Sequence, residues 1–397
     1  MVSGPRARLT REGWYYLAFT LFILGGAALR QINLLVVLGG MMAAPMLFSW
    51  RCGVLSLRMT AVRRLLPKRI FSGQPALVTV EVNNNRRRTT SWMLVIDDQL
   101  TRHESGTDQR QRVKGRSTCI VPTLNPQSSC TPKYRVQFGQ RGRYDFGPLR
   151  ISTLFPLGLL RVMRTFRVSD SLLVYPQIGR LLPPWHRLME SENPGVQYAS
   201  ARRGYADGDY YALRDWQAGD NRRWIHWRTT ARRGRLAVRQ FERQNKPDFA
   251  LLIDPWVGTG KGWQDVERAI SFAATVVVDL SHEGSQEITF GVADGQADFE
   301  THTNSRIFAN KLLERLAAAG ESNNNQPFLR LLAAAQRDVR SRTHLVIISS
   351  RSKTEATEAF HSAASDNSDS LATLARSTWI DCSSDQWRKY FRWDNDV

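Results

Sequence analysis

The chain has 397 residues and a formal net charge of +19, from 55 Lys and Arg against 36 Asp and Glu. A hydrophobic share of 42% supplies a sizeable core and excludes wholesale disorder, and four cysteines in so long a chain exclude a disulfide-bonded scaffold. So large a basic excess points to a polyanionic neighbour, either nucleic acid or an acidic membrane face. The length allows two or three domains of about 150 residues each.

Two uncharged apolar runs near the N-terminus predict a transmembrane helical hairpin over residues 1–52. The runs cover about 13–29 and 31–50, with Arg30 between them. A helix needs about 20 residues to cross the hydrocarbon layer, and the second run meets that length. Aromatic side chains stand at the outer ends of both runs, as in interfacial belts: Trp14, Tyr15, Tyr16 and Trp50.

The distribution of arginine predicts the orientation of this hairpin. Several arginines flank its outer ends, whereas the connection between the helices offers only Arg30. The positive-inside rule then places both tails in the cytoplasm, so we expect an inner-membrane protein with cytoplasmic soluble domains and free thiols. A cleaved signal peptide is the rival interpretation, and the second apolar run together with the lack of an Ala-x-Ala site argues against it.

Short alternating segments predict an antiparallel, immunoglobulin-like β-sandwich over residues 53–178. The candidate strands are 77–82, 92–96, 117–121, 134–138 and two short strands within 143–151. Residues 51–247 carry 36 basic and 14 acidic side chains, a net charge of +22, so this domain is strongly basic. The run Arg86-Arg87-Arg88 is expected in a solvated loop, and Cys119 and Cys130 are expected to pack within the domain.

Residues 248–397 predict an α/β domain with a doubly wound, largely parallel sheet. Continuous apolar runs at 249–253 and 345–348 suit strands buried on both faces, and apolar stripes at helical spacing lie within 266–280 and 328–339. The segment has 15 basic and 21 acidic side chains, a net charge of −6. Ligands of such sheets bind at the carboxyl ends of the strands, where Asp254 and Ser350 are expected.

The junction over residues 179–247 carries the densest motif, in which Arg, Asp and Trp interleave around turns. Its candidate binding or structural residues are Arg214, Gly219, Asp220, Arg223, His226, Trp227, Arg228 and Arg232. Arg groups pair with carboxylates and stack on indoles, so a self-satisfied network that fixes the junction is the favoured interpretation. A docking surface for an anionic ligand, membrane phosphate or protein partner is the alternative. His226 with Asp220 could form an acid–base pair, but a structural histidine is favoured.

The segment Leu213-Arg214-Asp215-Trp216-Gln217-Ala218-Gly219-Asp220, with Ile225-His226-Trp227-Arg228 after it, resembles the signature of the domain of unknown function 58 family. Similar upstream features include Phe155-Pro156-Leu157-Gly158-Leu159. The resemblance implies a C-terminal domain like the von Willebrand factor type A domain and an association with MoxR-type AAA+ ATPases. No enzymatic activity is implied.

The resemblance also implies a test for metal binding. Type A domains with a metal-ion-dependent adhesion site carry Asp-x-Ser-x-Ser after the first strand, and these oxygen ligands suit Mg²⁺. Here Asp254 keeps the carboxylate, but Trp256 and Gly258 replace the two serines, and Ser350 stands where a later Asp is expected. We therefore expect a degenerate site with no metal, and no cofactor.

The favoured function is a membrane-anchored adaptor whose type A-like domain docks a cytoplasmic partner, a MoxR-type AAA+ ATPase, in the assembly or maturation of protein complexes. The alternative is a membrane-tethered protein that binds a polyanion through the basic middle segment. Acidic lipid headgroups suit that segment, whereas the acidic C-terminal domain makes nucleic acid a poor candidate. A hydrolase that uses the Asp cluster of the junction is a third, weaker hypothesis.

Overall fold

The computed structural model describes residues 4–102, 115–191, 210–217, 222, 225–241, 249–258, 263–281, 287–294, 298–303, 305–338, 343–363 and 368–393. The chain forms two compact units. The first comprises Met1–Ile178 with Asn310–Glu321, and the second comprises Gly179–Ala309 with Ser322–Val397.

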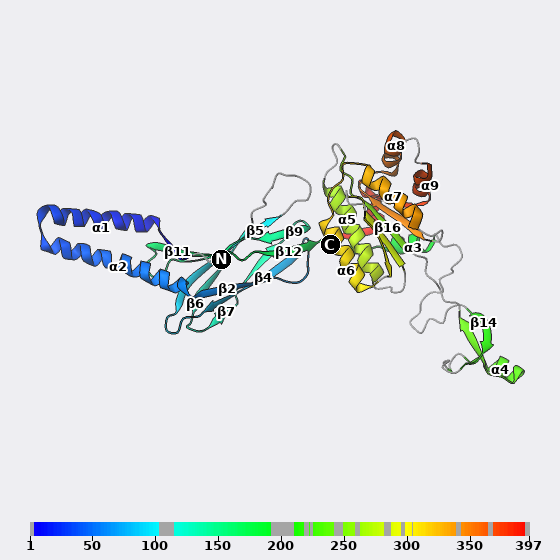
Figure 1. The fold of residues 1–397 in the computed structure, drawn as a ribbon, viewed down its shortest axis with the longest axis horizontal. Coiled ribbons are helices and arrows are strands. Elements are labelled where there is room, and N and C mark those ends of the chain that lie inside the picture. The colour runs from blue at the N-terminus through cyan, green and yellow to red at the C-terminus, as the bar shows by residue number, and fades with distance from the viewer. Residues whose placement is uncertain are drawn as a thin grey trace. The chain divides into compact units, whose positions relative to one another are not determined.

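Two apolar helices, α1 (Arg11–Arg30) and α2 (Asn33–Arg58), form a hairpin in the first unit (Figure 1). Both are long and apolar enough to cross a membrane. Thr10 caps α1, because its hydroxyl accepts a hydrogen bond from the Gly13 amide at 3.0 Å. α2 continues well past the expected end at residue 50. Its last turns pack on the β-domain, and a Cβ added at Gly53 would lie 2.4 Å from the side chain of Val162.

The rest of the first unit is built from two sheets, antiparallel throughout except for the parallel pair β12–β3. The larger sheet has the order β1-β11-β10-β5-β9-β12-β3, with β6 beside β5, and the smaller one has the order β2-β4-β7, with β8 beside β4. The strands are β1 (Arg6–Leu9), β2 (Thr60–Leu65), β3 (Ile70–Phe71), β4 (Pro75–Asn84), β5 (Ser91–Arg102), β6 (Gly115–Leu124), β7 (Ser129–Cys130), β8 (Lys133–Gln137), β9 (Gly142–Phe146), β10 (Leu149–Thr153), β11 (Leu160–Phe166) and β12 (Asp170–Tyr175).

The predicted strands of this domain are confirmed, and the structure adds strands that the sequence did not predict: β1, β2, β3, β7, β11 and β12. β11 and β12 come after the Phe155–Leu159 turn and complete the larger sheet. Alternating side chains of β4, Val78, Val80 and Val82, are fully buried in the core. Cys119 and Cys130 pack against the same core as free thiols.

Not every arginine of this basic domain reaches solvent. Arg64 is buried and bonds both oxygens of the Asp98 carboxylate, at 2.8 and 2.6 Å. Arg86 is also buried, with its Nε donating to Asn84 Oδ1 at 3.0 Å, so the expectation of a solvated Arg86–Arg88 run is wrong for its first residue. A buried guanidinium that is bonded in this way stabilises the fold and is unavailable to a ligand.

The second unit contains a five-stranded sheet with the order β18-β17-β16-β19-β20 (Figure 1). Its strands are β16 (Phe249–Asp254), β17 (Glu287–Val292), β18 (Asp298–Thr303), β19 (His344–Ser349) and β20 (Thr378–Asp381). All neighbours are parallel except β17 and β18, which confirms the predicted largely parallel sheet. The five strands, counted along the chain, follow the order 3-2-1-4-5, so the winding reverses between β16 and β19.

Helices bury the strands of this sheet on both faces. Ala250, Leu252 and Ile347 belong to one core cluster with α7 and α8, while Leu251 and Val346, whose side chains alternate with these, are also fully buried. The helices of the second half of the chain are α5 (Trp263–Ser281), α6 (Arg306–Ala318), α7 (Gln326–Asp338), α8 (Lys353–Ala363), α9 (Ser368–Arg376) and a 3-10 helix (Asp385–Lys389). Apolar side chains fill the inner face of α5, as its stripe predicted.

The first part of the expected junction belongs to this second unit. β13 (Gly179–Leu181) pairs with β21 (Phe391–Trp393) near the C-terminus. α3 (Pro183–Ser191) follows, and its buried Trp185 packs edge-on against Phe272 of α5, with ring centroids 5.3 Å apart. The long sequence separation of these partners explains why the spacing of residues did not reveal them.

Candidate functional site

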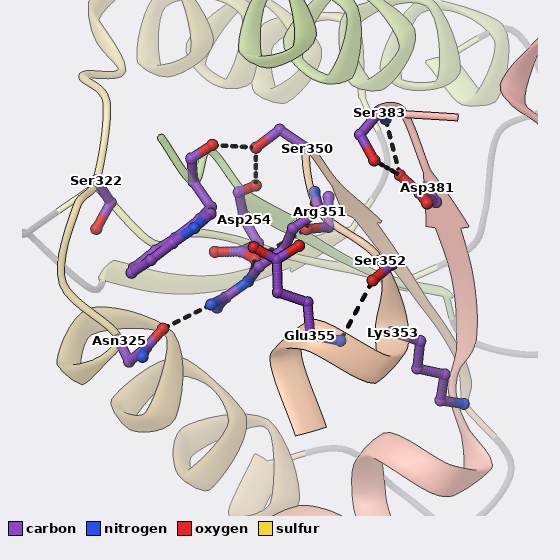
Figure 2. A network of polar contacts seen from close by, with 12 residues as sticks. Asp254, Ser322, Asn325, Ser350, Arg351, Ser352, Lys353, Glu355, Asp381 and Ser383 are labelled. Atoms are coloured by element: carbon purple, nitrogen blue, oxygen red, sulfur yellow. Dashed lines mark hydrogen bonds and ion pairs between the residues drawn. The ribbon is translucent and has the colours of Figure 1, made fainter. Parts of the chain in front are cut away.

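The carboxyl ends of β16 and β19 bring chemistry-bearing residues together at the point where the winding of the sheet reverses. Asp254 is the last residue of β16 and pairs with Ser349, the last residue of β19. Open α/β sheets bind their ligands at such a point. Asp254 and Ser350 therefore lie where the sequence placed them, at one end of the sheet (Figure 2).

The Asp254 carboxylate forms an ion pair with Arg351, a residue that the sequence analysis did not single out. Arg351 Nε donates to Asp254 Oδ2 at 2.8 Å, and Arg351 Nη1 donates to Asn325 Oδ1 at 2.6 Å (Figure 2). Both charged side chains are fully buried. The guanidinium also lies over the Trp256 ring, 4.3 Å from the centroid, which adds a cation–π contact. We call Asp254, Arg351, Asn325 and Trp256 the buried ion-pair site.

Serine hydroxyls complete this buried ion-pair site. Ser349 Oγ donates to Asp254 Oδ2 at 2.8 Å, and Ser350 Oγ donates to the Trp256 carbonyl at 2.6 Å. Burial raises the pKa of the Asp254 carboxyl, while Arg351 and Ser349 oppose that rise. Among the described residues, Asp254 Oδ1 and Arg351 Nη2 are buried without a hydrogen-bond partner.

Each position of the expected metal site now has a structural role. Trp256 stacks on Arg351, and Gly258 is close enough that an added Cβ would lie 3.1 Å from Trp256 Nε1. Asp254 already has a cation beside it, and the Glu355 carboxylate also acts on it electrostatically. Within the part of the chain that the structure describes, no three His, Cys, Asp or Glu side chains cluster as metal ligands. The arrangement therefore suits a permanent internal ion pair.

The signature motif forms a small module of its own within the second unit. β14 (Tyr210–Asp215) pairs with β15 (Ala237–Phe241), and the short helix α4 (Trp227–Arg233) lies between them in sequence. His226 begins the helix, because its Nδ1 accepts the Thr229 amide at 3.3 Å. Gly234 ends it in the left-handed conformation at φ 66°, which favours glycine. His226 thus caps the helix, while Asp220, its partner in the alternative acid–base pair, lies outside the described residues.

The described arginines of α4 point to solvent. Trp227 is 66% exposed, and four basic side chains that follow it in sequence are exposed: Arg228, Arg232 and Arg233 on α4, and Arg235 just after the helix. We call these five residues the basic α4 face. The network that the sequence favours stays a prediction, because several of its members lie outside the described residues. Gly219, Asp220, Arg223 and the side chain of Arg214 lie outside the described residues.

Among the comparisons with known proteins, a family match includes this part of the chain. Residues 212–372, which include the basic α4 face and the buried ion-pair site, match the family described as "Protein of unknown function DUF58". The chain is also 24% identical over 181 residues to "Uncharacterized protein YeaD" of Bacillus subtilis (strain 168). That match covers 43% of this chain and 44% of the relative, so it spans less than half of each.

Similarities to solved structures are low. A β-glucosidase from Listeria innocua in complex with glucose aligns at a TM-score of 0.21 and 14% identity, over 29% of this chain and 16% of that chain. The solution structure of a putative late embryogenesis abundant protein aligns at a TM-score of 0.20 and 8% identity, over 39% of this chain and 90% of that chain. TM-scores this low carry no conclusion about fold or activity.

Proposed function

We propose that the protein is a membrane-anchored adaptor of the DUF58 family whose second unit, a type A-like domain with a degenerate metal site, docks a cytoplasmic protein partner. The observation that carries the proposal is the basic α4 face, in which four exposed arginines follow the exposed Trp227 within eight residues. Arginine and tryptophan are enriched among the residues that dominate the energy of protein interfaces.

The buried ion-pair site supports an interaction role over a chemical one. Asp254, at the ligand-binding end of the sheet, is fully buried and paired with Arg351. A general acid or base must reach the proton that it transfers, and a metal-bridged contact needs a carboxylate open to the metal. Neither is available to a carboxylate enclosed by Arg351, Ser349 and Trp256.

The partner that fits this surface is a protein with an acidic face, and the family resemblance indicates a MoxR-type AAA+ ATPase. The candidate spans α1 and α2 would hold the adaptor in the inner membrane, with both units in the cytoplasm. The alternative of a polyanion-binding middle domain concerns only its exposed basic residues, because Arg64 and Arg86 are bonded inside that domain.

Co-purification with a MoxR-type ATPase from the same organism tests the proposal. The full chain, solubilised in mild detergent, is used as bait with and without ATP. We expect the double substitution Arg228→Glu and Arg232→Glu to reduce recovery of the ATPase at least about tenfold, since reversed charges in an interface centre cost several kcal/mol.

Arg330→Glu is the matched control, because Arg330 is an exposed arginine on α7 of the same unit. It should leave recovery of the ATPase unchanged. Equal recovery by the double variant and the control would refute docking through the basic α4 face. Failure of the unsubstituted chain to recover any ATPase, with or without ATP, would refute the choice of partner.

A further inference from the structure

The loop between β10 and β11 lies against the first turn of α1. The Thr10 amide donates to the Leu159 carbonyl at 3.1 Å, and the Thr10 hydroxyl donates to the Gly158 carbonyl at 2.8 Å. Gly13 is packed so closely that an added Cβ would lie 2.0 Å from the Leu159 carbonyl oxygen. Residues 154–159 therefore sit level with the start of the first candidate membrane span.

Large apolar side chains are exposed at this loop and on the neighbouring strand. Trp92, Met93, Phe155 and Leu157 are 42, 51, 36 and 53% exposed. Trp92 and Phe155 stack, with ring centroids 5.9 Å apart and an interplanar angle of 22°. We call these four residues the loop patch.

The loop patch is held in place by hydrogen bonds. Thr153 Oγ1 donates to the Trp92 carbonyl at 2.9 Å, and the Phe155 amide donates to Thr153 Oγ1 at 3.1 Å. Met93 has a φ of 49°, a left-handed conformation that non-glycine residues rarely adopt. Such a conformation persists only where its surroundings impose it, and it is associated with functional surfaces. The exposed apolar groups are thus presented by a defined structure.

Two exposed arginines stand opposite each other beside this loop. Arg8 of β1 stands directly opposite Arg161 of β11, and both are exposed. Like charges directly opposite each other on adjacent strands are destabilising. Arg161 interacts electrostatically with Asp97, which offsets part of that cost, and an anionic group between the two arginines would offset the rest. The next residues along β1 and β11, Leu9 and Leu160, also stand opposite each other, and Leu160 directly follows the loop.

We propose that the loop patch enters the headgroup region of the membrane and that Arg8 and Arg161 bind the phosphates of anionic lipids there. The inference rests on the proposed membrane anchor, because it is the start of α1 that sets the level of the loop. Aromatic side chains favour this interfacial depth, and basic side chains are attracted to an anionic leaflet. The β-domain would then be fixed to the membrane by a second contact besides the hairpin.

A fluorescent label on Leu157 tests this contact. Leu157→Cys carries a nitrobenzoxadiazole label in the full chain, with the four native cysteines replaced by serine, reconstituted in phosphatidylcholine liposomes with or without phosphatidylglycerol. Leu77→Cys is the matched control, because Leu77 is also 53% exposed. Leu77 lies on β4 seven residues before Asn84, and Asn84 pairs with Thr60 just after the end of α2. Seven residues of extended strand place Leu77 about 23 Å from Asn84 along β4.

We expect a blue-shifted emission at position 157 and at least about twofold stronger quenching by a lipid with a headgroup-level nitroxide than at position 77. Phosphatidylglycerol should increase that quenching, and Arg161→Gln should reduce the increase. If the serine background does not fold, hydroxyl-radical footprinting of the unsubstituted chain reads the same surface, with Met93 and Trp92 protected in liposomes and Leu77 not.

Three outcomes would overturn the inference. If the label emits as in water at both positions 157 and 77, the loop does not contact the membrane. If the same protein resists alkaline extraction, the membrane anchor is unaffected by that result. A blue shift at position 157 that requires added ATPase assigns the loop patch to a protein partner. Release of the protein by alkaline extraction removes the anchor and the loop contact together, while the docking proposal keeps its own test.

Discussion

Arg351→Met should destabilise the second unit more than any exposed arginine substitution in it. Methionine keeps much of the length of the side chain but removes the guanidinium, so Asp254 loses its cation in a fully buried setting. Removing one partner of a buried ion pair costs about 3–5 kcal/mol. Asn325 Oδ1 loses its donor as well, which adds to the cost.

Hydrogen–deuterium exchange of the full chain in detergent measures this loss locally. Amides of β16 and β19 exchange only when the sheet opens, so their rates report its opening free energy. A loss of about 3–5 kcal/mol accelerates exchange by roughly two to three and a half decades. Arg330→Met, an exposed change on α7, should alter the opening free energy by less than about 0.5 kcal/mol.

A double-mutant cycle with Asp254→Asn isolates the ion pair. Each single variant leaves one charged partner unbalanced, whereas the double variant leaves none. The opening free energy lost in the double variant should therefore be smaller than the sum of the two single losses by about 2–3 kcal/mol. Strict additivity, or a loss in Arg351→Met below about 1 kcal/mol, would refute the buried ion pair as the organiser of this sheet end.

The pH dependence of the same variant follows from the pKa of Asp254. Burial raises that pKa in the folded chain above the ordinary value of 3.8, and Arg351 opposes the rise. Between the unfolded and folded pKa values the folded chain holds the extra proton, so stability falls as pH rises through that window. Arg351→Met should widen the window, and a pH slope equal to that of the unsubstituted chain would contradict this assignment.

Three further outcomes are expected. Arg64→Met should lower the free energy of unfolding of the β-domain by about 3 kcal/mol, because it leaves the buried Asp98 without its cation. Urea-dependent proteolysis measures this loss, and Arg63→Met, at an exposed neighbour, should leave it unchanged. Burial, with a smaller effect of Asp98, raises the pKa of the Cys119 thiol to about 11, so its alkylation by iodoacetamide, followed by mass spectrometry, should accelerate about tenfold per pH unit up to that value; a flat rate would contradict the shift. Calorimetric titration with Mg²⁺ should give the same heats for the unsubstituted chain and Asp254→Ala, and a saturable heat lost in the variant would show a metal site.

Central strands of the second unit were predictable from the sequence, and edge strands were not. β16 and β19 are covered on both faces, so their residues form continuous apolar runs. β18, with the sequence Asp-Phe-Glu-Thr-His-Thr, lies at the edge of the sheet and shows no such run. Edge strands are covered less completely, and their composition therefore resembles that of loops.

The candidate site was predictable only in part, for a different reason. Position alone placed Asp254 at the end of a buried strand, and that prediction is confirmed. Arg351 follows a strand like any solvated arginine, and its burial depends on Asp254, 97 residues away, and on Asn325, 26 residues away. Hydrophobic periodicity reports which residues of one helix or strand face the core. It gives no sign that Arg351 is buried, because the partners of Arg351 come from distant parts of the chain.

The net charge of +19 does not describe one ligand surface, because the arginines differ in exposure. Arg64, Arg86 and Arg351 bond groups inside their own units, so they offer nothing to a ligand. Two groups of exposed basic residues lie in different units: Arg8 and Arg161 beside the loop patch, and the arginines of the basic α4 face.

If these groups serve different partners, charge reversal on α4 should abolish recovery of the ATPase without changing quenching at position 157. Arg161→Gln should do the opposite. Loss of both signals in either variant would mean that one anionic surface, rather than a membrane and a protein, contacts the chain.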